Sequence, residues 1–203
     1  MKFIYFDVGG VLIRDLSDTR DGWGMLLNSL GLKDKQRQKF NDFFKIIEKK
    51  LELGDGIEEF VSIMKNDFGI KLPDHYSISD DLVNRFFYKN EGIWKIVKKT
   101  SVRYELGLLT NMYKGMLNLI RNKGLISDVD WVIVDSSIER SRKPEKEFYE
   151  NAQKRSGVQG KDILFIDNKK ENLKIPKELG WKTFWFDSGN YERSNKELES
   201  FLR

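Results

Sequence analysis

The residues of this sequence that are best suited to chemistry are two carboxylates, a hydroxyl and a lysine near short apolar runs. Asp7, Thr110 and Asp167 each end such a run, Asn168 follows directly, and Lys143 lies between them in the chain. Carboxylate oxygens hold Mg²⁺, and a cation, a lysine and a hydroxyl together neutralise phosphate oxygens. These residue types therefore favour a phosphate bound beside a divalent cation, provided that the fold brings them together.

The elements that must position these residues are indicated by apolar runs typical of buried strands. The runs lie at residues 2–6, 106–109, 131–134, 163–166 and 183–186. Segments with helical spacing separate the later runs, and Gly124 ends the first of these helices. Pro144 is predicted in the first turn of the next one. Alternating strands and helices predict an α/β fold, with a doubly wound parallel sheet and helices on both faces.

The carboxyl ends of parallel strands lie at one edge of a sheet, where ligands bind. Asp7 follows the first predicted strand, Thr110 and Asn111 follow the second, and Asp167 follows the fourth. We therefore expect these side chains to converge.

Residues 18–90 have a different pattern, without a convincing strand. Apolar residues from Phe40 to Leu51 fall at i, i+3, i+4, i+7 and i+11, and the same spacing recurs from Ile57 to Phe68. This is the apolar stripe of an amphipathic helix. The pattern predicts an all-helical insert at 18–90, between two parts of one α/β core at 1–17 and 91–203.

Composition excludes several classes of chemistry. The chain of 203 residues has no cysteine and one histidine, which excludes disulfides, thiolate nucleophiles and cysteine metal sites. The net charge is +4, but lysine and arginine are mixed with acidic residues, so no nucleic-acid interface is predicted. The apolar runs are too short to span a membrane. We expect a cytoplasmic protein with no membrane partner, and the sequence indicates no oligomeric state.

The polar residues stand in motifs that resemble the four motifs of the haloacid dehalogenase-like (HAD-like) superfamily, in the same order. They are Phe6–Leu12, Leu108–Asn111, Arg142–Glu145 with Phe148 following, and Phe165–Asn168 with Asn172 following. The helical insert has the position of the family's cap. The segment Leu51–Phe60 is similar to one in the branch of small sugar-phosphate phosphatases and epoxide hydrolase N-terminal domains.

The resemblance implies a hydrolase that uses Asp7 as a nucleophile and forms a covalent aspartyl intermediate. Thr110 would bond the transferred group, and Lys143 would neutralise charge on the nucleophile and on the phosphoryl oxygens. Asn111 and Gly10 are assigned to substrate binding. Mg²⁺ is the implied cofactor, and its ligands would be Asp7, the carbonyl of Gly9, Asp167 and Asn168.

Two residues depart from the family's pattern. Most family phosphatases have a second aspartate two residues after the nucleophile, which protonates the leaving alcohol, and Gly9 stands there. General acid–base catalysis contributes about 10²–10⁴-fold, so a loss of that order is expected, smallest for good leaving groups. Asn168 replaces a usual carboxylate, which predicts weaker Mg²⁺ binding.

Three functions follow from these residues. The first is a Mg²⁺-dependent phosphatase of a small phosphorylated metabolite. The second is an impaired HAD-like protein that binds a phosphorylated ligand or a partner protein, and the third is a dehalogenase-type hydrolase. The first is favoured because Asp7, Thr110, Lys143 and Asp167 are all retained. If only the acid is missing, Gly9→Asp should raise activity on poor leaving groups.

Overall fold

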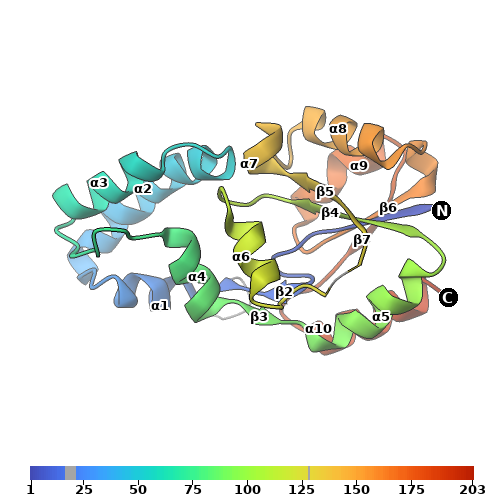
Figure 1. Ribbon diagram of the computed structural model, residues 1–203, viewed down its shortest axis with the longest axis horizontal. Helices are drawn as coiled ribbons and strands as arrows, with labels where there is room; N and C mark the ends of the chain where they lie inside the picture. The colour runs from blue at the N-terminus through green and yellow to red at the C-terminus, as the bar shows by residue number, and fades with distance from the viewer. Residues whose placement is uncertain (17–21, 128) are drawn as a thin grey trace.

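A parallel five-stranded sheet forms the centre of the protein (Figure 1). The computed structural model describes residues 1–16, 22–127 and 129–203. The strand order is β5-β4-β1-β6-β7. The strands are β1 (Phe3–Phe6), β4 (Glu105–Thr110), β5 (Trp131–Asp135), β6 (Ile163–Asp167) and β7 (Lys182–Trp185). The predicted α/β fold with a doubly wound parallel sheet is confirmed.

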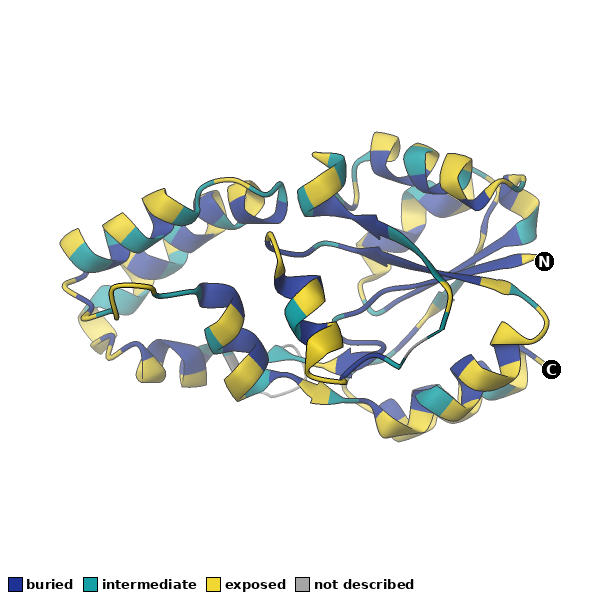
Figure 2. Cartoon of the chain, viewed as in Figure 1, coloured by how far each residue is buried: buried dark blue, intermediate teal, exposed yellow. Residues whose placement is uncertain are grey.

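Helices cover both faces of this sheet (Figure 1). On one face lie α8 (Lys146–Ser156) and α9 (Lys174–Glu178), and on the other lie α5 (Glu91–Ser101), α6 (Met116–Asn122) and α10 (Tyr191–Phe201). Side chains of β1 alternate between the two apolar layers: Phe3 and Tyr5 pack in the first, and Ile4 and Phe6 in the second. Figure 2 shows the resulting buried sheet between helices whose outer faces are exposed.

Four further helices lie together beyond one end of the sheet (Figure 1). They are α1 (Gly22–Ser29), α2 (Asp34–Glu52), α3 (Ile57–Asn66) and α4 (Ile78–Phe86). The predicted stripes produce α2 and α3, whose Phe40, Phe44 and Phe60 are buried against one another and Phe68. We continue to propose residues 18–90 as the cap; residues 17–21, which include its first boundary, lie outside the described residues.

Some elements of the structure were not predicted. Two short strands, β2 (Ile13–Arg14) and β3 (Tyr88–Lys89), form an antiparallel pair at the two ends of the helical segment. Two residues are too few to show the alternation of a strand. The short α7 (Ser136–Glu139) and the 3₁₀ helices η2 (Gly160–Asp162) and η3 (Lys170–Leu173) complete the chain. The predicted helical position of Pro144 is wrong, because α8 begins at Lys146.

None of the helices in the described ranges is both long and apolar enough to cross a membrane.

Candidate active site at the carboxyl ends of the strands

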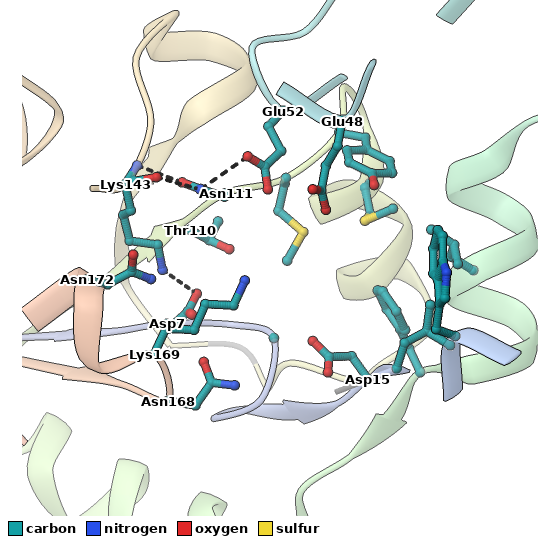
Figure 3. A pocket seen from close by; sticks show the side chains of 18 of the residues that line it. Asp7, Asp15, Glu48, Glu52, Thr110, Asn111, Lys143, Asn168, Lys169 and Asn172 are labelled. Atoms are coloured by element: carbon teal, nitrogen blue, oxygen red, sulfur yellow. Dashed lines mark hydrogen bonds and ion pairs between the residues drawn. The ribbon is translucent and has the colours of Figure 1, made fainter. Parts of the chain in front are cut away.

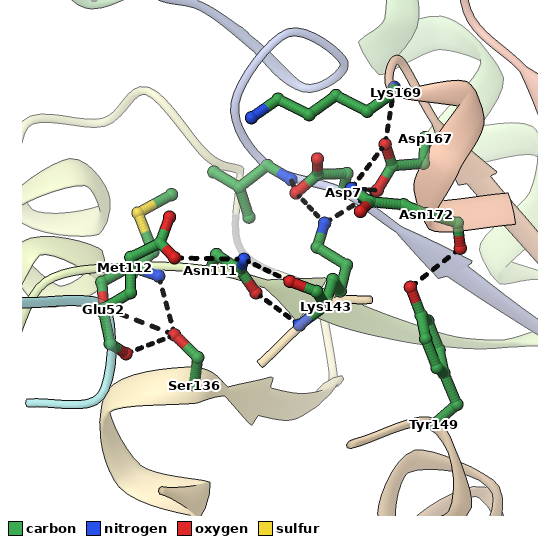
Figure 4. A network of polar contacts seen from close by, with 11 residues as sticks. Asp7, Glu52, Asn111, Met112, Ser136, Lys143, Tyr149, Asp167, Lys169 and Asn172 are labelled. Atoms are coloured by element: carbon green, nitrogen blue, oxygen red, sulfur yellow. Dashed lines mark hydrogen bonds and ion pairs between the residues drawn. The ribbon is translucent and has the colours of Figure 1, made fainter. Parts of the chain in front are cut away.

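The centre of the site is a buried lysine between two carboxylates. Lys143 Nζ lies 2.8 Å from Asp7 Oδ1 and 2.7 Å from Asp167 Oδ2 (Figure 4). Asp7 follows β1 and Asp167 ends β6, and these strands are neighbours in the sheet, which explains why the two carboxylates meet. Lys143 is only 2% exposed. A buried lysine needs such partners, because an unpaired charge away from water is costly.

Asp167 is held by three further hydrogen bonds. The side-chain amide of Asn172 donates to both carboxylate oxygens at 3.1 Å, and the backbone N–H of Lys169 donates to Oδ1 at 2.7 Å. The Tyr149 hydroxyl donates to the carbonyl of Asn172 at 2.8 Å and fixes that residue in turn. The orientation of Asp167 is therefore fixed before any ligand binds.

Burial and charge act in opposite directions on the members of this cluster. Burial raises the pKa of the Asp7 carboxyl, while the Lys143 ammonium lowers it and the neighbouring Asp167 raises it further. Burial alone would lower the pKa of Lys143, but the carboxylates of Asp167 and Asp7 outweigh burial and raise it. Lys143 therefore stays a cation, which is the form that neutralises an anion.

Two buried polar atoms beside this cluster have no hydrogen-bond partner within the described residues. They are the Thr110 hydroxyl oxygen and Asn168 Oδ1. Thr110 and Asn168 line the same pocket as Asp7 and Lys143. An unsatisfied buried polar atom costs roughly 1–3 kcal/mol, and native proteins retain few of them. A hydroxyl that can donate and a carbonyl that can only accept are suited to an anion and a cation respectively.

The donor set fits Mg²⁺. This ion is usually bound by one or two carboxylates plus waters and substrate phosphates, rather than by a complete protein cage. Asp7 would supply a pocket-lining carboxylate and Asn168 Oδ1 an unpartnered acceptor, whereas Asp167 is fully buried and both of its oxygens already accept hydrogen bonds. Within the described ranges, no group of three or more acidic, histidine or cysteine side chains is arranged to hold a metal. The residues thus match a Mg²⁺ site to which the protein contributes few ligands, while water and a substrate phosphate contribute the others.

The loop after Asp7 is a tight turn built on glycine. Gly10 has φ of +76°, which an L side chain rarely adopts, and its amide donates to the carbonyl of Ile13 at 2.9 Å. A β-carbon on Gly10 would collide with the side chain of Asn168. The Gly10 amide serves the turn, and its missing side chain makes room for Asn168. The role of Gly10 in substrate binding stays a prediction.

Asn111, also predicted to bind substrate, lines the pocket and is hydrogen-bonded to Lys143. Its Oδ1 accepts from the backbone N–H of Lys143 at 2.9 Å, and its amide donates to the Lys143 carbonyl at 3.1 Å and to Glu52 Oε2 at 3.3 Å (Figure 4). Both amide protons and one acceptor site are therefore used. A direct contact of Asn111 with substrate remains a prediction.

The pocket above Asp7 has a volume of about 270 Å³ and lies between the sheet edge and the helical segment (Figure 3). One wall is apolar and is formed mainly by Trp23, Leu26, Phe44, Leu82, Phe87, Met112 and Met116. Asp15, Glu48 and Glu52 add carboxylates, and Lys169 adds an ammonium group. The pocket therefore has room for a phosphate with a small organic group.

The end of α2 and the loop that follows it contact the core beside this pocket. Arg140 pairs with Asp55 and donates to the carbonyl of Leu53 at 2.8 Å. The Ser136 hydroxyl donates to the carbonyl of Glu52 at 2.6 Å. A β-carbon on Gly54 would approach the carbonyl of Ser137 closely, at 2.6 Å, so this contact requires glycine. The end of α2 is thereby fixed over the strand ends.

Sequence reasoning assigned no role to several residues that the structure places in the site, among them four with carboxylate or amide side chains. Glu48 and Glu52 are one turn apart on α2, a spacing that indicates a shared helix face but not what that face meets. Asn172 was noted with the fourth motif, but no role was assigned to it. Asp15 had no local signal, since its position depends on how the loop after Asp7 turns back.

A family model for haloacid dehalogenase-like hydrolases matches residues 1–180. The chain belongs to this family. A comparison with curated proteins found no match. Solved structures of the HAD family share the fold: an enzyme from Bacteroides thetaiotaomicron has a TM-score of 0.80 and 21% identity, over 100% of this chain and 98% of that one. That enzyme is also known in complex with magnesium and inorganic phosphate.

Other HAD-like structures differ in chemistry. A HAD phosphatase from Thermococcus onnurineus has a TM-score of 0.65 and 18% identity, over 100% of this chain and 98% of that one. An L-2-haloacid dehalogenase from Xanthobacter autotrophicus has a TM-score of 0.60 and 16% identity, over 92% and 77%. These similarities establish a common fold. The choice between phosphorus and carbon chemistry depends on the site residues.

Proposed function

We propose that this HAD-like hydrolase is a Mg²⁺-dependent phosphatase of a small phosphorylated metabolite and acts through an aspartyl-phosphate on Asp7. One observation carries the proposal. The unpartnered hydroxyl of Thr110 and the unpartnered Oδ1 of Asn168 line the same pocket as Asp7, whose carboxylate is paired with Lys143. The Thr110 hydroxyl and the Lys143 ammonium suit the phosphoryl oxygens. The Asn168 oxygen, which can only accept, suits the metal.

Asp7, Asp167, Asn168 Oδ1 and the carbonyl of Gly9 would hold Mg²⁺. When bound, Mg²⁺ polarises a phosphoryl oxygen and offsets negative charge in the transition state. Both oxygens of Asp167 already accept hydrogen bonds, from Lys143, Lys169 and Asn172, so a bond from Asp167 to Mg²⁺ would replace one of these.

Asp7 carries out the displacement. The backbone N–H of Val8 and the ammonium of Lys143 both bind Oδ1, at 2.7 and 2.8 Å, so we assign the attack on phosphorus to Oδ2. The bond from Oδ2 to phosphorus forms as the ester bond to the leaving alcohol breaks. Thr110 donates its hydroxyl proton in a hydrogen bond to a phosphoryl oxygen, and Lys143 neutralises the charge that develops. Water then attacks the aspartyl-phosphate and regenerates Asp7.

A second function is favoured by one residue. Gly9 has no side chain to protonate a leaving group, which supports an impaired protein that binds a phosphorylated ligand without rapid turnover. The dehalogenase alternative is supported by the fold shared with the Xanthobacter enzyme and by the absence of an acid at Gly9, which does not distinguish it from the second function.

The test is phosphate release by the purified protein from 4-nitrophenyl phosphate and a panel of sugar and alkyl phosphates, with and without Mg²⁺. We expect Mg²⁺-stimulated release that Asp7→Asn abolishes. Asp130→Asn is a matched control. Asp130 is exposed and precedes β5, so it lies at the amino ends of the parallel strands, whereas the pocket lies at their carboxyl ends. Tight phosphate binding without turnover would favour the second function, and halide release from 2-haloacids without Mg²⁺ would favour the third.

A further inference from the structure

The space that a side chain at position 9 would enter is occupied by the carboxylate of Asp15. A β-carbon built on Gly9 would overlap Asp15 Oδ2 and would lie 3.5 Å from Asp15 Cγ. No other heavy atom of the described structure outside the chain neighbours of Gly9 lies within 4 Å of that β-carbon. The missing side chain of Gly9 therefore leaves a space, and the Asp15 carboxylate fills it.

The loop after β1 explains why Asp15 returns to Gly9. The carbonyl of Val8 accepts the backbone N–H groups of Leu12 and Ile13, both at 3.0 Å, which closes the turn. Gly9 and Ile13 then form a bridge. The strand β2 continues this return and is fixed by its pairing with β3, in which Ile13 lies opposite Lys89. The backbone thus places residue 15 back beside residue 9.

Asp15 belongs to the same pocket as the nucleophile. It lines this pocket together with Asp7, Gly9 and Lys143. Figure 3 shows its carboxylate pointing from the lower right toward the loop that carries Asp7, across the pocket from Thr110. The carboxyl groups of Asp15 and of Asp7, which follows β1, therefore line one cavity of about 270 Å³.

We propose that Asp15 is the general acid and base of this enzyme, in place of a carboxyl group at position 9. The inference rests on the proposed phosphatase function. As Asp7 Oδ2 bonds to phosphorus and the ester bond breaks, the carboxylic acid of Asp15 gives its proton to the leaving oxygen, which departs as an alcohol. The Asp15 carboxylate then takes a proton from the water that attacks the aspartyl-phosphate. Asp7 is released as a carboxylate, and Asp15 is again an acid.

The same contact changes the expected effect of Gly9→Asp. In the wild-type background the new side chain meets Asp15, so one of the two groups must move, and no gain in activity is expected. In an Asp15→Gly background the space is open. The double variant Gly9→Asp/Asp15→Gly transfers the carboxyl group from one backbone position to the other and keeps one acid in the site.

The test compares kcat/KM for 4-nitrophenyl phosphate with kcat/KM for an alkyl phosphate, since only the alkoxide needs a proton as it leaves. Asp15→Asn should lose about 10²–10⁴-fold on the alkyl phosphate and less than about tenfold on the aryl phosphate. The double variant should recover most of the alkyl activity. Asp130→Asn, the exposed control at the amino ends of the strands, should leave both values unchanged.

A second measurement reports the base role. With 4-nitrophenyl phosphate, Asp15→Asn should give a burst of nitrophenol followed by a slow phase, and mass spectrometry should detect one added phosphoryl group on Asp7. Equal losses on both substrates, or no loss, would overturn the role of Asp15 while leaving the phosphatase intact. A wild-type protein that releases no phosphate from any ester would overturn both proposals. Circular dichroism of each variant separates loss of fold from loss of chemistry.

Discussion

Asn172 donates hydrogen bonds to both carboxylate oxygens of Asp167, each at 3.1 Å, and so fixes the plane of that carboxylate beside Lys143. Residues that orient a metal ligand typically contribute about 10- to 100-fold to metal affinity or activity. We expect Asn172→Ala to weaken Mg²⁺ binding by that order, measured as the Mg²⁺ concentration for half-maximal phosphatase activity and by calorimetry of Mg²⁺ alone. Asn122→Ala, at the exposed end of α6, should change neither value.

Lys143 is the cation between two buried carboxylates, and its removal leaves both unpaired. Breaking a buried ion pair from one side costs about 3–5 kcal/mol. We expect Lys143→Met to abolish activity and to lower the free energy of unfolding by that amount in Mg²⁺-free buffer, measured by urea denaturation. Added Mg²⁺ should restore part of the stability, because it supplies the lost positive charge. Lys146→Met, whose ion pair is exposed, should cost less than about 1 kcal/mol.

Glu52 predicts a pH dependence of stability. Burial raises the pKa of this carboxyl to about 7, although the nearby Arg142 opposes the shift. The folded protein therefore holds the Glu52 proton more tightly than the unfolded chain does, so the stability that this proton provides is complete below about pH 4 and is lost as the pH rises through about 7.

Glu52→Gln keeps the neutral form at every pH and isolates this effect. Relative to the variant, the wild-type protein should lose roughly 2–3 kcal/mol of stability between pH 5 and pH 8, measured by urea denaturation of both proteins. Parallel stability profiles would instead mean that Arg142 keeps Glu52 ionised throughout.

The charge of the pocket predicts which phosphorylated substrates are accepted. Glu48 lies one helical turn from Glu52 on α2 and lines the pocket (Figure 3), and Glu52 is paired with Arg142. A substrate with a second anionic group should therefore be hydrolysed poorly, whereas hydroxyl or amino groups should be accepted. Glu48→Gln should raise kcat/KM for a carboxylate-bearing phosphate ester about 3- to 10-fold and leave a neutral ester unchanged, as removal of one repulsion near solvent implies. An equal effect on both esters would contradict this electrostatic role.

Most of the fold and the centre of the site could be predicted from the sequence. Apolar runs and helical spacing are local patterns, so β1, β4, α2 and α3 were identified directly. The convergence of Asp7 and Asp167 also followed, because residues at the carboxyl ends of neighbouring parallel strands meet at one edge of the sheet. The order of the motifs then indicated the family, which the family model confirms.

The tertiary structure decided what surrounds Asp7, because these contacts depend on how distant backbone segments approach one another. Asn111 is bound to Lys143, and Glu52 reaches the core from α2, although local spacing indicates neither partner. The sequence determined that position 9 is a glycine without an acid. Only the turn of the backbone through β2 determined that the carboxylate of Asp15 occupies the space this glycine leaves.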